Sequence, residues 1–344
     1  MRRVLIFIHS LTASAFSLEY AAPGRVVAIG DVHGDYPAFV RTLRNARLVD
    51  GNERWIGGDA TLVQLGDLLD RGANEAECWS LLRRLQADAP RAGGGRVIRL
   101  LGNHEVMNVC AIASNFIHPA GHGAFGTDRL LAFAPGGAIA TEMADCCTVA
   151  AIIGDSCFVH AHLPADATRE SLKTLNQATQ RWLRGEPAKP EDDVICTLVE
   201  VDGFQGSGRP QYSAATCLPL ALSHMAERDK SPIWGRLLSS PSGEQPSHEH
   251  CDALRQSLAR LGVSRLVVGH TPQRVINAAC DGLVWRCDTG MSEFVMSGAS
   301  QALEISQDGT VRVLDGDAAQ SGGAARSREA AAANAGDTTY FDIF

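Results

Sequence analysis

Four short apolar runs in this chain each lead to a glycine that is followed by a metal-binding residue type. These pairs are Gly30-Asp31, Gly66-Asp67, Gly102-Asn103 and Gly269-His270, and a further run, Phe158-Val159, ends at His160. Glycine permits a sharp turn, so the next side chain can point over the edge of a sheet. Asp, His and Asn suit divalent cations such as Mn, Fe and Zn. Because buried Asp and His cost free energy unless they are paired or metal-bound, the repetition predicts a metal site.

The segments that would position these residues alternate between strands and helices. We expect strands at 25–29, 61–65, 96–101, 157–160 and 265–268, and helices at 37–47, 75–87, 167–184 and 251–261. The helices are predicted from apolar residues at helical spacing, such as Trp79, Leu82 and Leu85. This alternation predicts an α/β fold, in which ligands bind beyond the carboxyl ends of the strands.

The composition fits a globular protein and gives no sign of a nucleic-acid partner. Of 344 residues, 45% are hydrophobic and 20% charged, and the formal net charge is −8. Nucleic-acid binders hold phosphate backbones with basic patches, so we expect no nucleic acid to bind. A phosphate site can still be locally positive, because bound metals supply charge.

Three motifs contain the first three strand ends. Residues 30–34 resemble GDxHG, residues 66–72 resemble GDxxDRG, and residues 102–105 read GNHE. In this order they resemble the three blocks of the phosphoprotein phosphatase family, within the calcineurin-like metallophosphoesterases. Further segments resemble the Shewanella-like branch of that family: 100–108, 268–273 and 288–292. The resemblance covers about residues 25–316, and it implies two mixed β-sheets flanked by helices.

The resemblance also implies a two-metal site at the strand ends. Asp31 and His33 would hold one ion, Asp67 would bridge both, and the second ion would be completed by Asn103, His160 and His270. The ions would be Mn²⁺, with Fe and Zn as alternatives. A hydroxide between them would attack the phosphorus of a phosphate monoester.

Further residues are implied to act on the substrate. His104 would be the general acid that protonates the leaving oxygen, and Asp70 would accept a hydrogen bond from its other ring nitrogen. The substrate phosphate would be bound by Arg71, Asn103 and Arg236. The two arginines suit this role because a guanidinium fits two phosphate oxygens. Asp70 in a surface salt bridge and Arg236 as an ordinary surface arginine are the competing interpretations.

The sequence departs from the family pattern at two places. The family has His-Gly-Gly after the fourth strand, whereas this chain has His160-Ala161-His162. His162 could narrow the pocket, bind substrate or point away. The SAPNY segment of the eukaryotic serine/threonine enzymes is replaced by residues 288–292, so tyrosine-directed or mixed activity is expected.

The expected function is therefore hydrolysis of phosphotyrosine, phosphoserine or phosphothreonine in protein substrates. One alternative is a hydrolase of dinucleoside polyphosphates such as diadenosine tetraphosphate, which shares the metal motifs. Another is a catalytically inactive metal-binding scaffold. The scaffold would require the loss of a ligand, of His104 or of Arg71, and all of these residues are present.

We expect three regions along the chain: a targeting segment at 1–22, the catalytic domain at 23–316 and a disordered tail at 317–344. The start is basic, then apolar, then Ala13-Ser14-Ala15, which is typical of a secretory signal peptide. Export to the secretory pathway or periplasm, or import into an organelle, is expected, with the cytoplasm as the alternative. The apolar run is too short to span a bilayer, so no stable membrane insertion is expected.

Two further expectations concern the middle of the chain and the cysteines. Stretches 202–219 and 239–246 are rich in Gly, Ser and Pro, and we interpret them as loops of a cap or insert at about 185–250. The ten cysteines show no metal-binding spacing. Buried free thiols are expected, with pairing as the alternative if the chain is exported.

Overall fold

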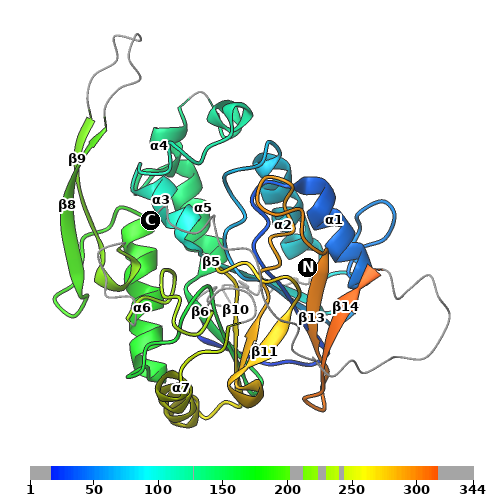
Figure 1. Ribbon diagram of the computed structural model, residues 1–344. Helices are drawn as coiled ribbons and strands as arrows, with labels where there is room; N and C mark the ends of the chain where they lie inside the picture. Colours follow the sequence, from blue (N-terminus) through cyan, green and yellow to red (C-terminus); the bar gives the residue numbers. More distant parts are fainter. Residues whose placement is uncertain (1–16, 127, 202–211, 224–229, 240–243, 317–344) are drawn as a thin grey trace, which may run out of the picture.

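The computed structural model describes residues 17–126, 128–201, 212–223, 230–239 and 244–316 (Figure 1). The expected tail and most of the expected targeting segment lie outside this part of the chain. Strand β1 (Glu19–Tyr20) falls within residues 17–22 of that segment and pairs with β6 (Ala150–Ile153).

Two six-stranded sheets form the centre of the molecule, in the orders β14-β13-β2-β3-β4-β5 and β1-β6-β7-β10-β12-β11. The first contains β2 (Val26–Ile29), β3 (Thr61–Gln64), β4 (Arg96–Leu100), β5 (Cys147–Thr148), β13 (Gln301–Ile305) and β14 (Val311–Asp315). The second adds β7 (Ser156–Val159), β10 (Arg265–Val268), β11 (Asn277–Ala279) and β12 (Val284–Arg286). Both sheets mix parallel and antiparallel pairs.

The strands are apolar on both faces because each sheet is covered on both sides. In β2, Val26 and Ala28 belong to the apolar cluster between the sheets, which also contains Phe158 of β7. Val27 and Ile29 belong to the cluster under the helices. Successive side chains of a strand point to opposite faces, so one short strand contributes to both clusters.

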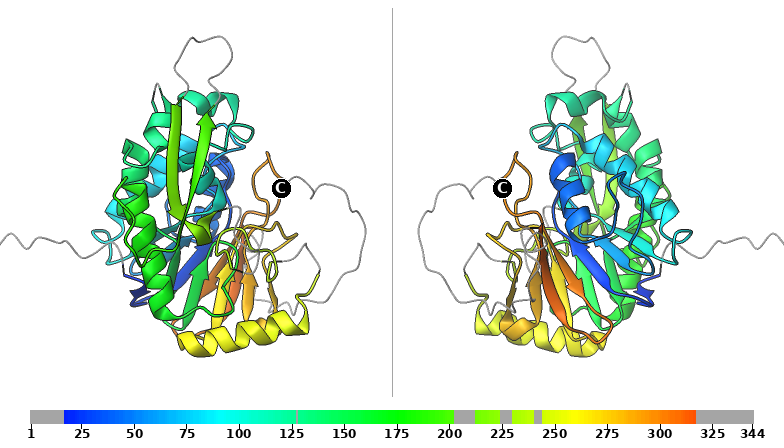
Figure 2. Two further views of the ribbon diagram at one scale, coloured as in Figure 1. Left: turned by 90° about the vertical axis from the view of Figure 1, so that its left-hand side faces the viewer. Right: turned by 90° about the vertical axis from the view of Figure 1, so that its right-hand side faces the viewer.

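Helices cover the outer faces of the two sheets, so the fold is a helix–sheet–sheet–helix sandwich (Figure 2). Helices α1 (Tyr36–Asn45) and α2 (Glu75–Asp88) pack on the first sheet. Helix α7 (His248–Leu261) covers the second sheet and buries Leu254 and Leu258 against it. The two-sheet α/β fold expected from the sequence is confirmed.

The remaining helices are short or lie around the edge of the first sheet. They are α3 (Asn103–Val109), α4 (Arg129–Phe133), α5 (Ala138–Cys146) and α6 (Arg169–Leu183), with 3₁₀ turns η1 (Pro119–Gly123), η2 (Leu220–Leu222) and η3 (Cys280–Gly282). Every strand and helix expected by range is present, with small shifts at its ends. The largest shift is in α7, which begins at His248 because the side chain of Ser247 accepts a hydrogen bond from the His250 amide.

One sequence-based expectation in the middle of the chain is wrong. Part of the stretch expected to be loop, Tyr212–Pro219, is strand β9, and it pairs along its whole length with β8 (Val194–Val201). This two-stranded sheet is separate from the two central sheets and lies beside α6 (Figure 1). Residues 202–211, between the two strands, lie outside the described part of the chain.

The expectation of free thiols is wrong for two of the cysteines. Cys251 of α7 and Cys280 of η3 form a disulfide across 29 residues. Among the cysteines whose side chains the structure describes, six more are free: Cys78, Cys110, Cys146, Cys147, Cys157 and Cys287. The pairing depends on how α7 packs beside β11 and β12, which no spacing in the sequence reveals.

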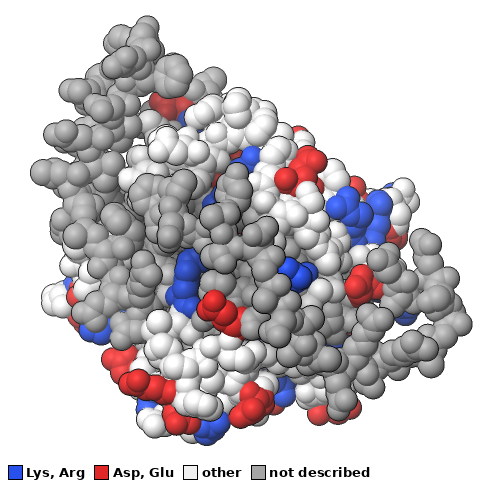
Figure 3. Space-filling model, in the orientation of Figure 1, with Lys and Arg blue, Asp and Glu red and all other residues white. Residues whose placement is uncertain are grey.

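On the face drawn in Figure 3, the coloured basic and acidic side chains are interspersed. Among the described residues, no helix is both long and apolar enough to cross a membrane.

Candidate metal centre and active site

The strand ends singled out in the sequence meet at one place. Asp31, Asp67 and Asn103 follow β2, β3 and β4, which are neighbouring parallel strands of the first sheet. His160 and His270 follow β7 and β10, which are neighbouring parallel strands of the second sheet. The site therefore lies where the carboxyl ends of both sheets come together.

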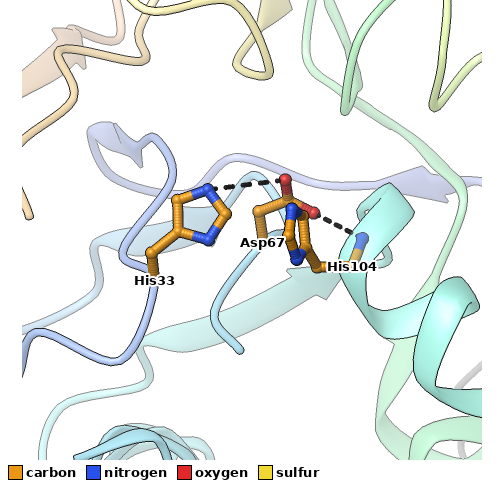
Figure 4. Close-up of side chains that lie close together, drawn as sticks. All are labelled: His33, Asp67 and His104. Atoms are coloured by element: carbon orange, nitrogen blue, oxygen red, sulfur yellow. Dashed lines mark hydrogen bonds and ion pairs between the residues drawn. The ribbon is translucent and has the colours of Figure 1, made fainter. Parts of the chain in front are cut away.

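Asp67 is at the centre of this cluster. Its Oδ2 lies 3.8 Å from Nε2 of His33 and 3.5 Å from Nε2 of His160. Two groups of potential ligand atoms share Asp67: one with His33 and His104, the other with His160 and His270. Figure 4 shows the first group: His33 comes from the loop after β2, and His104 comes from the first turn of the helix 103–109, whose main-chain amide at His104 donates to Oδ1 of Asp67. A carboxylate shared by two groups is the arrangement that a bridging ligand requires.

Hydrogen bonds tie the other predicted ligands to the same cluster. The amide of His270 donates to Oδ1 of Asp31 over 3.0 Å. Oδ1 of Asn103 lies 3.1 Å from Nε2 of His160. All of the residues predicted to hold metals are thus brought together, and each is at most 6% exposed.

The two histidines nearest Asp67 are oriented by main-chain carbonyls. Nδ1 of His33 lies 3.0 Å from the carbonyl oxygen of Leu69, and Nδ1 of His160 lies 2.7 Å from that of Leu65. Bonds of this kind fix the ring and leave Nε2 as the ligand atom. In both residues it is Nε2 that approaches Asp67.

Glycines make room for the carboxylates. A Cβ at position 102 would lie 2.1 Å from Oδ1 of Asp67, and one at position 269 would lie 2.4 Å from Oδ1 of Asp31. Real Cβ contacts are much longer, so any side chain at either glycine would displace a predicted ligand. These two glycines are therefore needed because the main chain lies close to the carboxylates of Asp67 and Asp31.

Several residues of the site adopt the left-handed backbone region, which is unfavourable for side chains with a Cβ. The φ angles are 46° at His33, 52° at Asp67, 65° at Asp70, 66° at Arg71 and 70° at His270. Left-handed residues other than glycine gather where the surrounding structure holds a functional geometry. Here the surrounding structure includes a carboxylate beneath the loop after β3.

Glu105 is that carboxylate. It accepts hydrogen bonds from the amides of Asp67, Leu68, Leu69 and Gly102, at 2.8, 3.0, 3.3 and 2.8 Å. The side chain therefore fixes the loops after β3 and β4 relative to each other. This gives a structural reason for the last residue of the GNHE motif.

The charges at the site fit bound cations. Burial raises the pKa of Asp31 well above its usual value, and the nearby carboxylate of Asp288 raises it further. Burial also lowers the pKa of His270, whose Nε2 is buried without a hydrogen-bond partner among the described residues. Crowded carboxylates and a neutral imidazole with an unsatisfied nitrogen are what two divalent cations would stabilise.

His104 makes a different set of contacts from the other histidines. Its Nδ1 lies 2.7 Å from Oδ2 of Asp70, which is fully buried. Asp70 also accepts bonds from the Asn108 amide group, at 3.0 Å to each carboxylate oxygen. The interpretation of Asp70 as a surface salt bridge is therefore wrong. With Nδ1 held by Asp70, the proton that His104 could donate is on Nε2.

A sequence model of the calcineurin-like phosphoesterase family matches residues 24–274 of this chain, which include every strand end described above. The chain belongs to this family. This phosphoesterase is 29% identical to Shewanella-like protein phosphatase 2 of Arabidopsis thaliana, over 86% of this chain and 78% of that one. It is 28% identical to Shewanella-like protein phosphatase 1 of Plasmodium berghei, over 80% and 69% of the two chains. The resemblance to the Shewanella-like branch is confirmed.

Solved structures share the fold of this phosphoesterase. The cold-active protein-tyrosine phosphatase of a psychrophilic Shewanella species aligns with a TM-score of 0.60 at 19% identity, covering 87% of this chain and 82% of that one. A protein serine/threonine phosphatase from Saccharomyces cerevisiae aligns with a TM-score of 0.55 at 14% identity, covering 86% and 82%.

Arg129 was missed in the sequence and lies beneath the His104–Asp70 pair of the phosphoesterase. Its guanidinium donates to Oδ1 of Asp70 over 3.2 Å, to Oδ1 of Asn108 over 2.9 Å and to both carboxylate oxygens of Glu75. Glu75 in turn accepts the amide of Asp70 over 2.9 Å. Arg129 therefore neutralises two buried carboxylates. The only sequence signal is an arginine that follows a potential helix cap, Asp128.

We expect that replacing Arg129 with Met destabilises the protein by about 3–5 kcal/mol, since the buried carboxylates of Asp70 and Glu75 would lose their counter-charge. Denaturant unfolding followed by circular dichroism measures this change. Arg83→Met is the matched control, because Arg83 is 63% exposed and pairs with Glu142 at 3.5 Å. That control should change stability by less than about 1 kcal/mol. Equal effects for the two substitutions would contradict the assignment.

The two predicted phosphate-binding arginines lie on different sides of the site. The pKa of His33 is lowered by burial, by His104 and also by Arg71, which places Arg71 near the first metal group. Nε of Arg71 is buried with no hydrogen-bond partner among the described residues, so its N–H can still donate to an oxygen of a ligand. NH1 of Arg236 donates to the His270 carbonyl over 3.3 Å and to Thr271 Oγ1 over 3.0 Å, which places it near the second group.

Two other residues lie near the centre. His162, which replaces a family glycine, is 5% exposed, and its amide bonds to the Pro232 carbonyl. Asp288 was not predicted to belong to the site, yet burial raises its pKa to about 6, and Asp67 contributes to the rise. A signal existed, because Asp288 follows the β12 strand end, but it comes after Cys287 rather than a glycine.

Proposed function

We propose that this phosphoesterase hydrolyses phosphate monoesters of phosphoproteins. The observation that carries the proposal is the buried His104–Asp70 pair beside the Asp67-centred cluster. A positioned proton donor next to metal ligands suits the cleavage of an ester whose leaving oxygen must be protonated. The Shewanella-like protein phosphatases among its relatives support a phosphoprotein as the substrate.

Each residue of the site has a part in this proposal. Divalent cations held by the predicted ligands would supply an activated water and positive charge for the phosphoryl oxygens. His104 donates the proton on Nε2 to the leaving oxygen, and Asp70 holds its ring in the required tautomer. Arg71, Arg236 and the amide of Asn103 bind and orient the phosphate. We further propose Mn²⁺ as the resident metal, with Fe and Zn as alternatives, because the donor set is mixed imidazole and carboxylate.

The proposal is tested by comparing three substrates at equal concentration in the presence of Mn²⁺. We expect phosphotyrosine and phosphoserine peptides to release phosphate, whereas diadenosine tetraphosphate stays intact, because the two arginines are proposed to bind a terminal phosphoryl group and diadenosine tetraphosphate has none. Colorimetric phosphate release and chromatography of nucleotides are the measurements. Asp67→Asn serves as the control for contaminating phosphatases. Faster cleavage of diadenosine tetraphosphate would replace this proposal with the nucleotide hydrolase.

We propose tyrosine-directed or mixed specificity, since residues 288–292 stand in place of the SAPNY segment. We also propose that the protein works in an oxidising compartment, reached through a leader at about 1–22. The Cys251–Cys280 disulfide supports this, because disulfides persist outside the reducing cytosol. We also propose that the chain is divided into three regions. They are the leader, a catalytic domain at 23–316 with an insert at about 185–250, and a tail at 317–344.

A further inference from the structure

Arg99, in β4, is a buried cation whose two terminal nitrogens lack a hydrogen-bond acceptor in the described part of the chain. It is 2% exposed, and neither NH1 nor NH2 has a hydrogen-bond partner among the described residues. Its guanidinium lies 3.9 Å from the ring centroid of Trp79 in α2. Contact with the face of an aromatic ring stabilises a buried cation by only about 2 kcal/mol. Burying a charge without a counter-charge costs several kcal/mol of folding free energy. An anion is therefore expected beside Arg99.

The carboxylates that face Arg99 are engaged elsewhere. Glu142 accepts the indole N–H of Trp79 over 2.9 Å and pairs with Arg83 over 3.5 Å. Glu105 is surrounded by the four main-chain amides described above. Burial lowers the pKa of Arg99, but two nearby thiols and, after them, these two carboxylates raise it above its usual value.

Those thiols are the adjacent residues Cys146 and Cys147, where α5 ends and β5 begins. Their Sγ atoms lie 3.5 Å apart, and Cys147 is directly opposite Arg99 in the β4–β5 ladder. The hydrogen bond between the two thiols and the charge of Arg99 lower the pKa of Cys146, while the same hydrogen bond and burial raise the pKa of Cys147. Asp145, the remaining nearby carboxylate, pairs with Arg184 at 2.7 Å. The pair therefore lies where the guanidinium of Arg99 can stabilise the anionic form of Cys146.

We propose that Cys146 and Cys147 form a reversible oxidation site, in which Arg99 stabilises the Cys146 thiolate and hydroperoxides are the oxidant. Sensor cysteines combine a stabilised thiolate, partial exposure and a neighbouring resolving cysteine. Cys146 is partly exposed and Cys147 is buried beside it.

The reaction takes two balanced steps. The Cys146 thiolate attacks one oxygen of the hydroperoxide, so an S–O bond forms, the O–O bond breaks and an alkoxide or hydroxide leaves. The Cys147 sulfur then attacks the Cys146 sulfur, giving the disulfide, and the sulfenic oxygen leaves as water with the Cys147 proton. Overall, two thiols are oxidised by two electrons and the hydroperoxide is reduced to an alcohol and water.

The product should be easily reduced. Adjacent Cα atoms are about 3.8 Å apart, whereas disulfides usually join Cα atoms about 4.4–6.8 Å apart. The bond between neighbouring residues is therefore strained, and strained disulfides are the labile ones. This distinguishes the pair from Cys251–Cys280, whose Cα atoms are 5.2 Å apart.

The experiment treats the full chain with hydrogen peroxide, alkylates the remaining thiols and analyses the peptide that contains both cysteines by mass spectrometry. We expect the unalkylated peptide to have lost two hydrogen atoms and to recover them with dithiothreitol. In Cys147→Ser, oxidation should stop at a sulfenic acid on Cys146 that dimedone traps. Cys110, whose pKa burial raises to about 12, is the internal control and should react at least about tenfold more slowly.

Arg99 is tested in the Cys147→Ser background. Arg99→Met should slow dimedone trapping at Cys146 at least about tenfold, whereas Arg99→Lys should retain most of the rate. An unchanged rate in Arg99→Met would overturn the role of Arg99. If that variant does not fold, the Cys146-to-Cys110 rate ratio in the unmutated protein decides the matter. A ratio near one, or a product that dithiothreitol does not reverse, overturns the proposal.

Discussion

Replacing His104 with Asn should lower kcat for a phosphoserine peptide by about 10²–10⁴-fold, the usual value of general acid–base catalysis. The serine alkoxide is a poor leaving group, so its departure depends on the proton that His104 donates. The loss should be much smaller for p-nitrophenyl phosphate, whose phenolate leaves without protonation. Steady-state kinetics with the two substrates measure the difference.

Two measurements separate this role from metal binding, because the His104 ring also lies within reach of His33 and Asp67. The metal content of His104→Asn, determined by elemental analysis, should equal that of the unmodified protein. Asp70→Asn should show the same dependence on the leaving group in weaker form, since it disturbs the tautomer of His104 but keeps the donor. Undiminished phosphoserine turnover in His104→Asn, or loss of a metal, would show that the assignment is wrong.

Removal of divalent cations by a chelator should abolish phosphatase activity, and Mn²⁺ should restore it. The six predicted ligands are buried together, and the sequence holds no motif for another cofactor. Activity assays before and after dialysis against chelator, with Mn²⁺, Fe²⁺ and Zn²⁺ added back separately, test both the requirement and the choice of metal.

Calorimetric titration with Mn²⁺ provides a readout that does not depend on activity. Asp67→Asn should weaken both binding events, because Asp67 belongs to both groups of ligand atoms. Asp155→Asn is a matched control, since Asp155 is exposed and pairs with Arg265 on the surface. Full activity in a preparation shown to be metal-free would refute the two-metal proposal.

The metal ligands that the sequence predicted share one property: each lies within a few residues of a strand end. Gly66 and Asp67, for example, are adjacent, so one motif contains both the residue that permits the turn and the ligand. The alternation of apolar strands and amphipathic helices likewise places those ends on one edge. The sandwich and its ligands were therefore predictable from local patterns.

What the sequence did not reveal depends on contacts between distant segments. Arg129 reaches Glu75 across 54 residues and Asp70 across 59, and no motif surrounds it. Cys251 and Cys280 meet only because α7 packs on the second sheet. Strand β9 was expected to be a loop because it adjoins a Gly-rich stretch, and its state is decided by pairing with β8.

The left-handed residues of the site bear on how this protein can evolve. A left-handed backbone costs roughly 1–3 kcal/mol of stability in a residue other than glycine. Asp67, Asp70 and Arg71 therefore occupy positions at which glycine would be more favourable for the backbone. Drift in a lineage that no longer needed the activity would be expected to convert these positions to glycine first, because stability would then improve as function disappeared. In related sequences, glycine at the left-handed positions of the first or second motif would mark a chain that has kept the fold and lost the selection for catalysis.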